Sequence, residues 1–201
     1  MKPESGNAAS SGSGRVTRST HQLVEMGLMV SLASVLSQIA LVHWPQGGSV
    51  TLGASIPIWA VARRYGTSSG VLAGVSLGIV NLLFGGAVIH PLQGALDYPM
   101  AFGALGLAGW PISASLGIAL SAAVRFACHC IAGLMFFASY APAGFDPTMY
   151  VLLYNGSLVL PDTLIAMWGF HKMSVRIPGL IEAADGVDPR RRTRSSGEDL
   201  S

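Results

Sequence analysis

The segment SASLGIALSAAVRFACHCIAGLMFFA, residues 113–138, decides the fold class, because Arg125 is its only charged residue. A helix needs about 20 consecutive, mostly apolar residues to cross the hydrocarbon core of a bilayer. Residues 113–138 exceed that length without a proline or a cluster of polar residues. They therefore predict a membrane-spanning helix.

The rest of the chain has the same character. Of its 201 residues, 51% are hydrophobic and 11% are charged, and the mean hydropathy is +0.52. A soluble domain carries about 25% charged residues. Charges cluster toward the ends, and between positions 65 and 171 they comprise only Asp97, Arg125, Asp146 and Asp162. This pattern excludes a soluble enzyme and a disordered chain, and a net charge of +2 is too small for nucleic-acid binding.

Five further apolar segments complete the membrane domain, at about 22–42, 51–63, 67–85, 92–109 and 148–170. The segment 51–63 is short for a full span. Clusters of glycine, proline and polar residues separate the segments, as at 43–48 and 141–144. We expect an all-α integral membrane protein with six transmembrane helices at 21–172, between a disordered polar N-terminal tail at 1–20 and an arginine-rich polar C-terminal tail at 173–201.

The lysines and arginines set the orientation of these helices. With the N-terminus inside, 11 of the 12 basic residues fall on the cytoplasmic side, and only Arg125 lies within a span. The three outer loops then carry none. This is a strong positive-inside signal, so we expect both termini in the cytoplasm and an even number of spans in a multi-pass plasma-membrane protein.

Burying polar and ionisable side chains at membrane depth costs free energy, so their presence there points to a functional site. Arg125 and His129 share one face of their helix because they are four residues apart. Depths at 1.5 Å per residue place Arg125 and Asp162 near or just below the middle of the membrane, and His129 and Asn155 in its outer half. We hypothesise a buried Arg125–Asp162 ion pair beneath a polar site, the alternative being that each group finds separate partners. With Asp97 and nearby aromatic rings, the site would be an outward-facing pocket for a flat, polar or cationic ligand.

Two patterns are set aside. The sequence GVSLG at 74–78 matches the nucleophile motif of serine hydrolases, but that motif needs a strand before its turn, whereas 74–78 lies inside an apolar helix. Helix packing through small residues explains it better, although an intramembrane hydrolase using Ser76 and His129 is a distant alternative. Cys128 and Cys130 are two apart in a helix, so they point to different faces and predict no metal site. We expect no cofactor and no ATPase motif.

Three stretches of the membrane domain carry a family resemblance. They are RFACHCIAG at 125–133, continuing through Tyr140 and Tyr150 to Asn155; QGGSVT at 46–51 with RRYG at 63–66; and HPLQ at 90–93 with Asp97 and Tyr98. Here the chain resembles the thiamine-specific substrate-binding (S) components, ThiT/YuaJ-like, of energy-coupling factor (ECF) transporters of prokaryotes. The resemblance covers about residues 22–172.

The resemblance implies a thiamine site near the outer face, closed by the loop after the first helix. It implies ligand contacts from these residues: Trp44, Asp97, Tyr98, His129, Phe137, Tyr150 and Asn155, with Gly133 leaving room for the ring. It also implies that Gly27 and Ser31 dock on a transmembrane coupling subunit, whose ATPase partners supply energy. Some members have Glu at the position of Asp97 and Trp at that of Phe137.

The resemblance therefore implies a vitamin-uptake subunit without enzymatic activity, embedded in the lipid bilayer. Within the same class, the ligand could instead be a thiamine precursor or another vitamin. A membrane protein that only supports structure and binds no ligand is the remaining alternative.

Overall fold

The structure is a computed structural model that describes residues 11–44 and 48–177. Its helical elements are α1 (Ser11–Gln38), α2 (Ser55–Tyr65), α3 (Thr67–Leu83), α4 (Pro91–Ala95), the π-helical η1 (Leu96–Met100), α5 (Ala101–Gly103), the 3-10 helix η2 (Ala104–Gly109), α6 (Ala114–Phe136), the 3-10 helix η3 (Ala138–Tyr140) and α7 (Pro147–Arg176). Two short strands, β1 (Ala40–His43) and β2 (Ser49–Thr51), follow α1. The described chain is thus predominantly helical.

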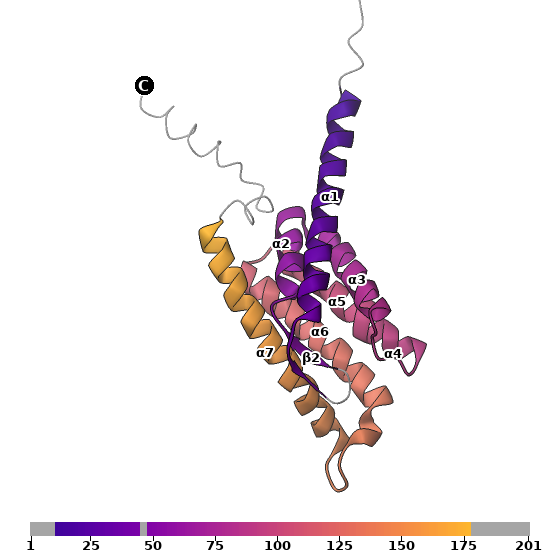
Figure 1. Cartoon of the computed structure of the whole chain (residues 1–201). Helices are drawn as coiled ribbons and strands as arrows, with labels where there is room; N and C mark the ends of the chain where they lie inside the picture. Colours follow the sequence, from indigo (N-terminus) through magenta and orange to yellow (C-terminus); the bar gives the residue numbers. More distant parts are fainter. Residues whose placement is uncertain (1–10, 45–47, 178–201) are drawn as a thin grey trace, which may run out of the picture.

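The long helices run along one another and define two ends of the molecule (Figure 1). The beginning of α1 and the end of α7 lie at one end, while the β1–β2 hairpin, α4 and the turn between α6 and α7 lie toward the other. This arrangement brings segments far apart in sequence together at the hairpin end, where α7 contacts β2 and α6 contacts η1.

Helix α2 forms the centre of the core. It spans 11 residues, a length of about 16 Å, whereas the hydrocarbon core of a bilayer is about 30 Å thick. Ile58 and Trp59 are almost fully buried together with Leu77 of α3 and Leu105 of η2. The Trp59 ring meets Phe170 of α7 edge-on, with 6.0 Å between the ring centroids. The short segment expected at 51–63 is therefore a buried central helix that begins at Ser55.

The fourth apolar segment is helical but irregular. Pro99 lies inside it and has no N–H to donate, and the chain widens there into the π-helical turn η1. Helix α3 packs closely on this segment, because a Cβ on Gly78 would lie 2.5 Å from the carbonyl oxygen of Tyr98, and one on Gly74 would collide with that of Phe102. The GVSLG sequence at 74–78 is thus a packing surface, as predicted.

The exposed surface is strongly apolar. On α7, Leu160, Leu164 and Trp168 are each more than 60% exposed, whereas Asp162 and Ala166 on the opposite face are buried. Apolar groups outside and polar groups inside are what a bilayer demands. In the part of the chain that the structure describes, Ala114–Phe136 and Pro147–Arg176 are long and apolar enough to cross a membrane, and Thr67–Leu83 is a shorter apolar helix.

Two sequence-based boundaries are corrected. The segment 22–42 is not one helix, because α1 ends at Gln38 and residues 40–43 form β1, which pairs antiparallel with β2. The predicted disordered tail also ends earlier: residues 1–10 lie outside the described residues, and helix α1 already begins at Ser11. At the other end α7 continues to Arg176, and residues 178–201 lie outside the described part.

Candidate functional site

A cavity of about 390 Å³ opens at the hairpin end of the molecule. This volume is within the range of small-molecule sites, about 300–1,000 Å³. Its walls come from the end of α1, the hairpin, the end of α3, η1, α6 and α7. The polar and aromatic residues that line it are Ser37, Gln38, His43, Ser49, Thr51, Ser55, Asn81, Phe84, Gln93, Asp97, Tyr98, Phe102, Arg125, His129, Phe137, Tyr150, Tyr154, Asn155 and Asp162.

Asp97 lies in the π-helical turn η1, and both of its carboxylate oxygens are engaged. His129 Nδ1 lies 2.8 Å from Oδ1, and Gln93 Nε2 donates to Oδ2 over 2.7 Å. A carboxylate only accepts hydrogen bonds, so the contact with His129 requires the proton on Nδ1. Gln93 is itself buried and also donates to the Ala87 carbonyl. Asp97 is therefore a fixed acceptor in the cavity wall, with its orientation set by two neighbours.

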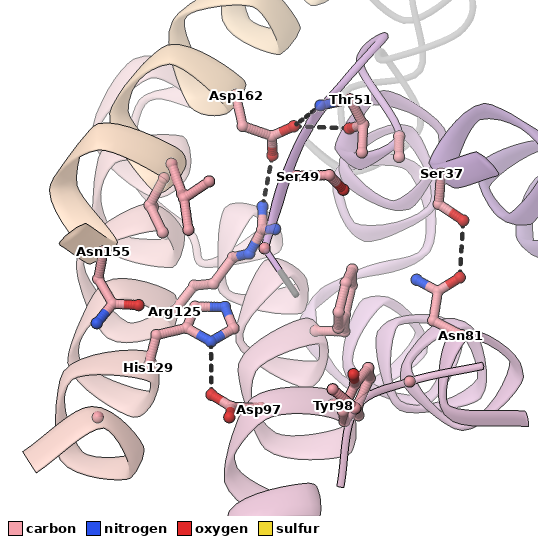
Figure 2. Close-up of a pocket in the computed structure, with 18 of the residues that line it drawn as sticks. Ser37, Ser49, Thr51, Asn81, Asp97, Tyr98, Arg125, His129, Asn155 and Asp162 are labelled. Atoms are coloured by element: carbon pink, nitrogen blue, oxygen red, sulfur yellow. Dashed lines mark hydrogen bonds and ion pairs between the residues drawn. The ribbon is translucent and has the colours of Figure 1, made fainter. Parts of the chain in front are cut away.

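A buried ion pair lies deeper, as hypothesised from sequence. Arg125 Nη1 lies 2.7 Å from Asp162 Oδ2 (Figure 2), and Asp162 is only 2% exposed. The second carboxylate oxygen accepts from both the main-chain N–H and the hydroxyl of Thr51, at 3.0 and 2.6 Å. One carboxylate thus joins α6, α7 and strand β2. The guanidinium also lies over the Phe102 ring, 5.1 Å from its centroid.

The α6–α7 side of the cavity carries rings and an amide. Phe137 follows α6 directly, and Tyr150 and Tyr154 lie one turn apart on α7 with 6.1 Å between ring centroids. The Asn155 side-chain N–H donates to the Val151 carbonyl over 3.0 Å, so its Oδ1 remains as an acceptor facing the cavity (Figure 2). This wall offers aromatic faces and one acceptor to a flat ligand.

Gly133 has a packing role that its sequence did not show. A Cβ there would lie 2.6 Å from Val151 Cγ1 and 3.2 Å from Asn155 Nδ2. The missing side chain therefore lets α6 and α7 approach closely and leaves Asn155 in place beside the cavity.

Six of the expected ligand residues meet at this cavity together with Gly133; Trp44 does not. The six are Asp97, Tyr98, His129, Phe137, Tyr150 and Asn155. Trp44 follows strand β1, and its indole N–H donates to the hydroxyl of Ser157 over 3.0 Å. Its ring is thereby held against α7 instead of lining the cavity.

The docking residues expected on α1 lie away from the site. Ser31 is exposed, and its hydroxyl donates to the Gly27 carbonyl over 2.9 Å. A Cβ on Gly27 would meet nothing within 4 Å. Beside them, Leu28 is 66% exposed. This face of α1 is open and apolar.

Sequence reasoning missed several cavity residues, and Ser37, Asn81 and Thr51 are three of them. Asn81 is an amide within the apolar helix α3, and that anomaly could have marked it. Ser37 and Thr51 carried no signal, because hydroxyls are common in membrane helices, where they bond their own backbone. Among the described residues no three His, Cys, Asp or Glu side chains gather as metal ligands, and Cys128 and Cys130 are free thiols.

Comparison with known proteins gives the family. A family model described as thiamine transporter protein (Thia_YuaJ) matches residues 23–181. The chain belongs to this family. Two relatives named thiamine transporter ThiT are each 30% identical to it. The Bacillus subtilis relative aligns over 182 residues, 81% of this chain and 94% of its own. The Lacticaseibacillus paracasei relative aligns over 186 residues, 82% of this chain and 92% of its own.

A solved structure shares the fold of this chain. ThiT from Listeria monocytogenes superposes with a TM-score of 0.73 at 22% sequence identity, covering 82% of this chain and 98% of that one. The family consists of transporters, so the expectation of a non-enzymatic protein is confirmed. The resemblance to ThiT/YuaJ-like S-components is confirmed as well, and the apolar helices agree with a bacterial membrane protein.

Proposed function

We propose that this chain is the substrate-binding membrane subunit of an ECF-type uptake transporter and that its ligand is thiamine. The observation that carries the proposal is the cavity whose walls combine a fixed carboxylate, aromatic rings and amide acceptors. Membership of the thiamine transporter family supports the choice of ligand. The subunit would bind the vitamin at the outer face and deliver it inward.

The chemistry of thiamine matches these walls. Its thiazolium ring is permanently cationic, its aminopyrimidine has an exocyclic amine, and its hydroxyethyl arm ends in a hydroxyl. The Asp97 carboxylate offsets the cation, and the faces of Phe137 and Tyr150 attract it and stack on the rings. Asn155 Oδ1 would accept from the exocyclic amine. Nothing here requires a covalent step.

The direction of transport follows from the placement of the cavity and the basic residues. Residues of the hairpin line the cavity, and the hairpin lies toward the end of the molecule opposite the beginning of α1 and the end of α7 (Figure 1). If both termini lie in the cytoplasm, as the basic residues favour, the cavity would open outward. Energy would come from an ECF module, its transmembrane coupling subunit docking on the open face of α1 at Gly27 and Ser31 and its ATPase subunits driving release.

The first test is calorimetric titration of the full chain, purified in detergent, with thiamine, riboflavin and biotin. We expect saturable one-to-one binding of thiamine alone. Asp97→Asn should weaken it by at least about tenfold, because the thiazolium cation loses the negative charge that offsets it. Asp146→Asn is the matched control, since Asp146 is an exposed helix cap to which Asn is equally suited.

Each outcome of this test has a clear meaning. Folded protein that gives no heat with thiamine would refute the thiamine assignment and direct the search to its precursors and other vitamins. Equal thiamine affinity in the Asp97 and Asp146 variants would remove the carboxylate from the binding site.

A further inference from the structure

The cavity has a second polar side that none of the expected ligand residues occupies. Ser37 from the end of α1 and Asn81 from α3 face each other there, across the view from Asn155 (Figure 2). The cavity-lining residues of α1 and α3, Ser37, Gln38 and Asn81, carry no charge. This side therefore suits an uncharged polar group.

A proton count fixes what Asn81 offers to the cavity. The Ser37 hydroxyl oxygen lies 2.7 Å from the carbonyl oxygen of Ser34 and 2.7 Å from the nearer terminal atom of Asn81, drawn as Oδ1. One hydroxyl proton cannot serve two acceptors, and two oxygens at 2.7 Å without a proton between them repel. Turning the amide so that Nδ2 donates to Ser37 satisfies both contacts.

With the amide turned, Ser37 donates to its own backbone and accepts from Asn81. The Gln38 side-chain N–H, 3.4 Å from the Ser37 oxygen, is a second donor to it. The atom of Asn81 directed away from Ser37 is then Oδ1, an acceptor. The second side of the cavity thus presents a hydrogen-bond acceptor held in place by a serine.

Space beside this acceptor depends on small residues. The loop after α3 lines the cavity with Gly85, Gly86 and Ala87. A Cβ on Gly86 would lie 2.6 Å from the Tyr98 hydroxyl, so only glycine lets the Tyr98 ring occupy its place in the cavity wall. The chain leaves room here for one end of a ligand whose other end reaches Asp97.

We infer that Asn81 is a specificity-determining residue that accepts a hydrogen bond from the hydroxyl of the ligand's hydroxyethyl arm. The inference rests on the proposed thiamine function and adds a contact to it. The ligand spans the cavity, with its cationic and aminopyrimidine rings at Asp97 and Asn155 and its hydroxyl at Asn81. A site built around an acceptor discriminates against a ligand that has lost the donor, because the bound ligand shields the acceptor from water and leaves it unpaired.

Three ligands test this assignment by calorimetry on the full chain in detergent. They are thiamine, an analogue with an ethyl arm in place of hydroxyethyl, and the methyl ether of the arm. Both analogues lack the donor, but the ether keeps the oxygen. We expect both to bind about five- to tenfold more weakly than thiamine.

Variants then connect the difference to Asn81. Asn81→Leu should bind all three ligands equally. Asn81→Asp should retain the preference for thiamine, because Ser37 can turn its proton from the Ser34 carbonyl to the nearer carboxylate oxygen, and the other oxygen still offers an acceptor to the cavity. Ser76→Ala is the matched control on α3: its hydroxyl donates to the Leu72 carbonyl and it does not line the cavity. We expect it to behave as the unmodified chain does.

Several results would overturn the inference. If the unmodified chain bound the ethyl analogue as tightly as thiamine, the arm hydroxyl would have no partner. If the ether bound as tightly as thiamine, the cavity would present a donor to the arm. A preference that survived in Asn81→Leu would assign the contact elsewhere. If the unmodified chain bound none of the three, the thiamine function itself would fail.

Discussion

Replacing Asp162 with asparagine tests the buried network that joins the hairpin to the helices. Asp162→Asn preserves the size of the side chain but removes its charge. One terminal atom can still accept from Thr51. The other becomes an N–H group at the position of Oδ2, which lies 2.7 Å from the Arg125 Nη1 donor in the unmodified chain. Two donors then face each other, and the buried guanidinium loses its counter-ion.

The expected loss of stability is large. Removing one partner of a buried ion pair costs about 3–5 kcal/mol, and Asp162 is 2% exposed. For a chain of this length each kcal/mol lowers the melting temperature by about 2–4 °C. We therefore expect a fall of roughly 10 °C for Asp162→Asn. Thermal unfolding of the detergent-solubilised protein, followed by tryptophan fluorescence, measures it.

The same charge change at a different place is the control. Asp146→Asn on α7 alters an exposed carboxylate that caps the helix, and asparagine caps as well. Its melting temperature should stay within about 2 °C of the unmodified chain. An Asp162→Asn variant that melted together with this control would refute the reasoning, because a buried pair could not then contribute to the fold.

The remaining predictions concern the packing of α6 against α7 and a hydrogen bond between α2 and α1. Gly133→Ala should cost about 1–3 kcal/mol by overpacking against Val151. Gly27→Ala, with open space around it in the interior of α1, should not lower the melting temperature, because alanine favours a helix over glycine; equal melting temperatures of the two variants would remove the packing role from Gly133. Tyr65→Phe removes the hydroxyl that donates to the Glu25 carboxylate between α2 and α1, and thermal unfolding should register a loss of about 1 kcal/mol. An unchanged melting temperature in Tyr65→Phe would mean that this hydrogen bond does not stabilise the fold.

Sequence alone predicted the helices well where they are long and apolar. The segment 113–138 became α6 at Ala114–Phe136, and 148–170 became most of α7, which continues to Arg176. Depth along these two helices was enough to pair Arg125 with Asp162, because a helix has a fixed rise per residue. Apolar composition, helical period and rise per residue are local properties of a segment, so they can be worked out from a single sequence.

The features that the sequence did not predict depend on how neighbouring helices and strands pair and pack against one another. The apolar residues at 40–42 continue the hydrophobic run of α1, and only pairing with residues 49–51 reveals a strand. Asp97 and His129 were both site candidates, but their direct contact needs the relative rotation of η1 and α6. Arg63 was counted among the basic residues of the cytoplasmic side, yet it is buried and donates to carbonyls of the turn after η2.

Thr51 and Asp162 are joined by two hydrogen bonds, but the two positions differ in how well they tolerate substitution. One of the two hydrogen bonds is donated by the main-chain N–H of residue 51, which every amino acid except proline has. Evolutionary drift at position 51 can therefore change the side chain and still keep this link between hairpin and helix. Position 162 has no such reserve, because its contribution is entirely side-chain oxygen. Across a set of functional variants, tolerance at 51 and intolerance at 162 would be the genetic signature of this single carboxylate.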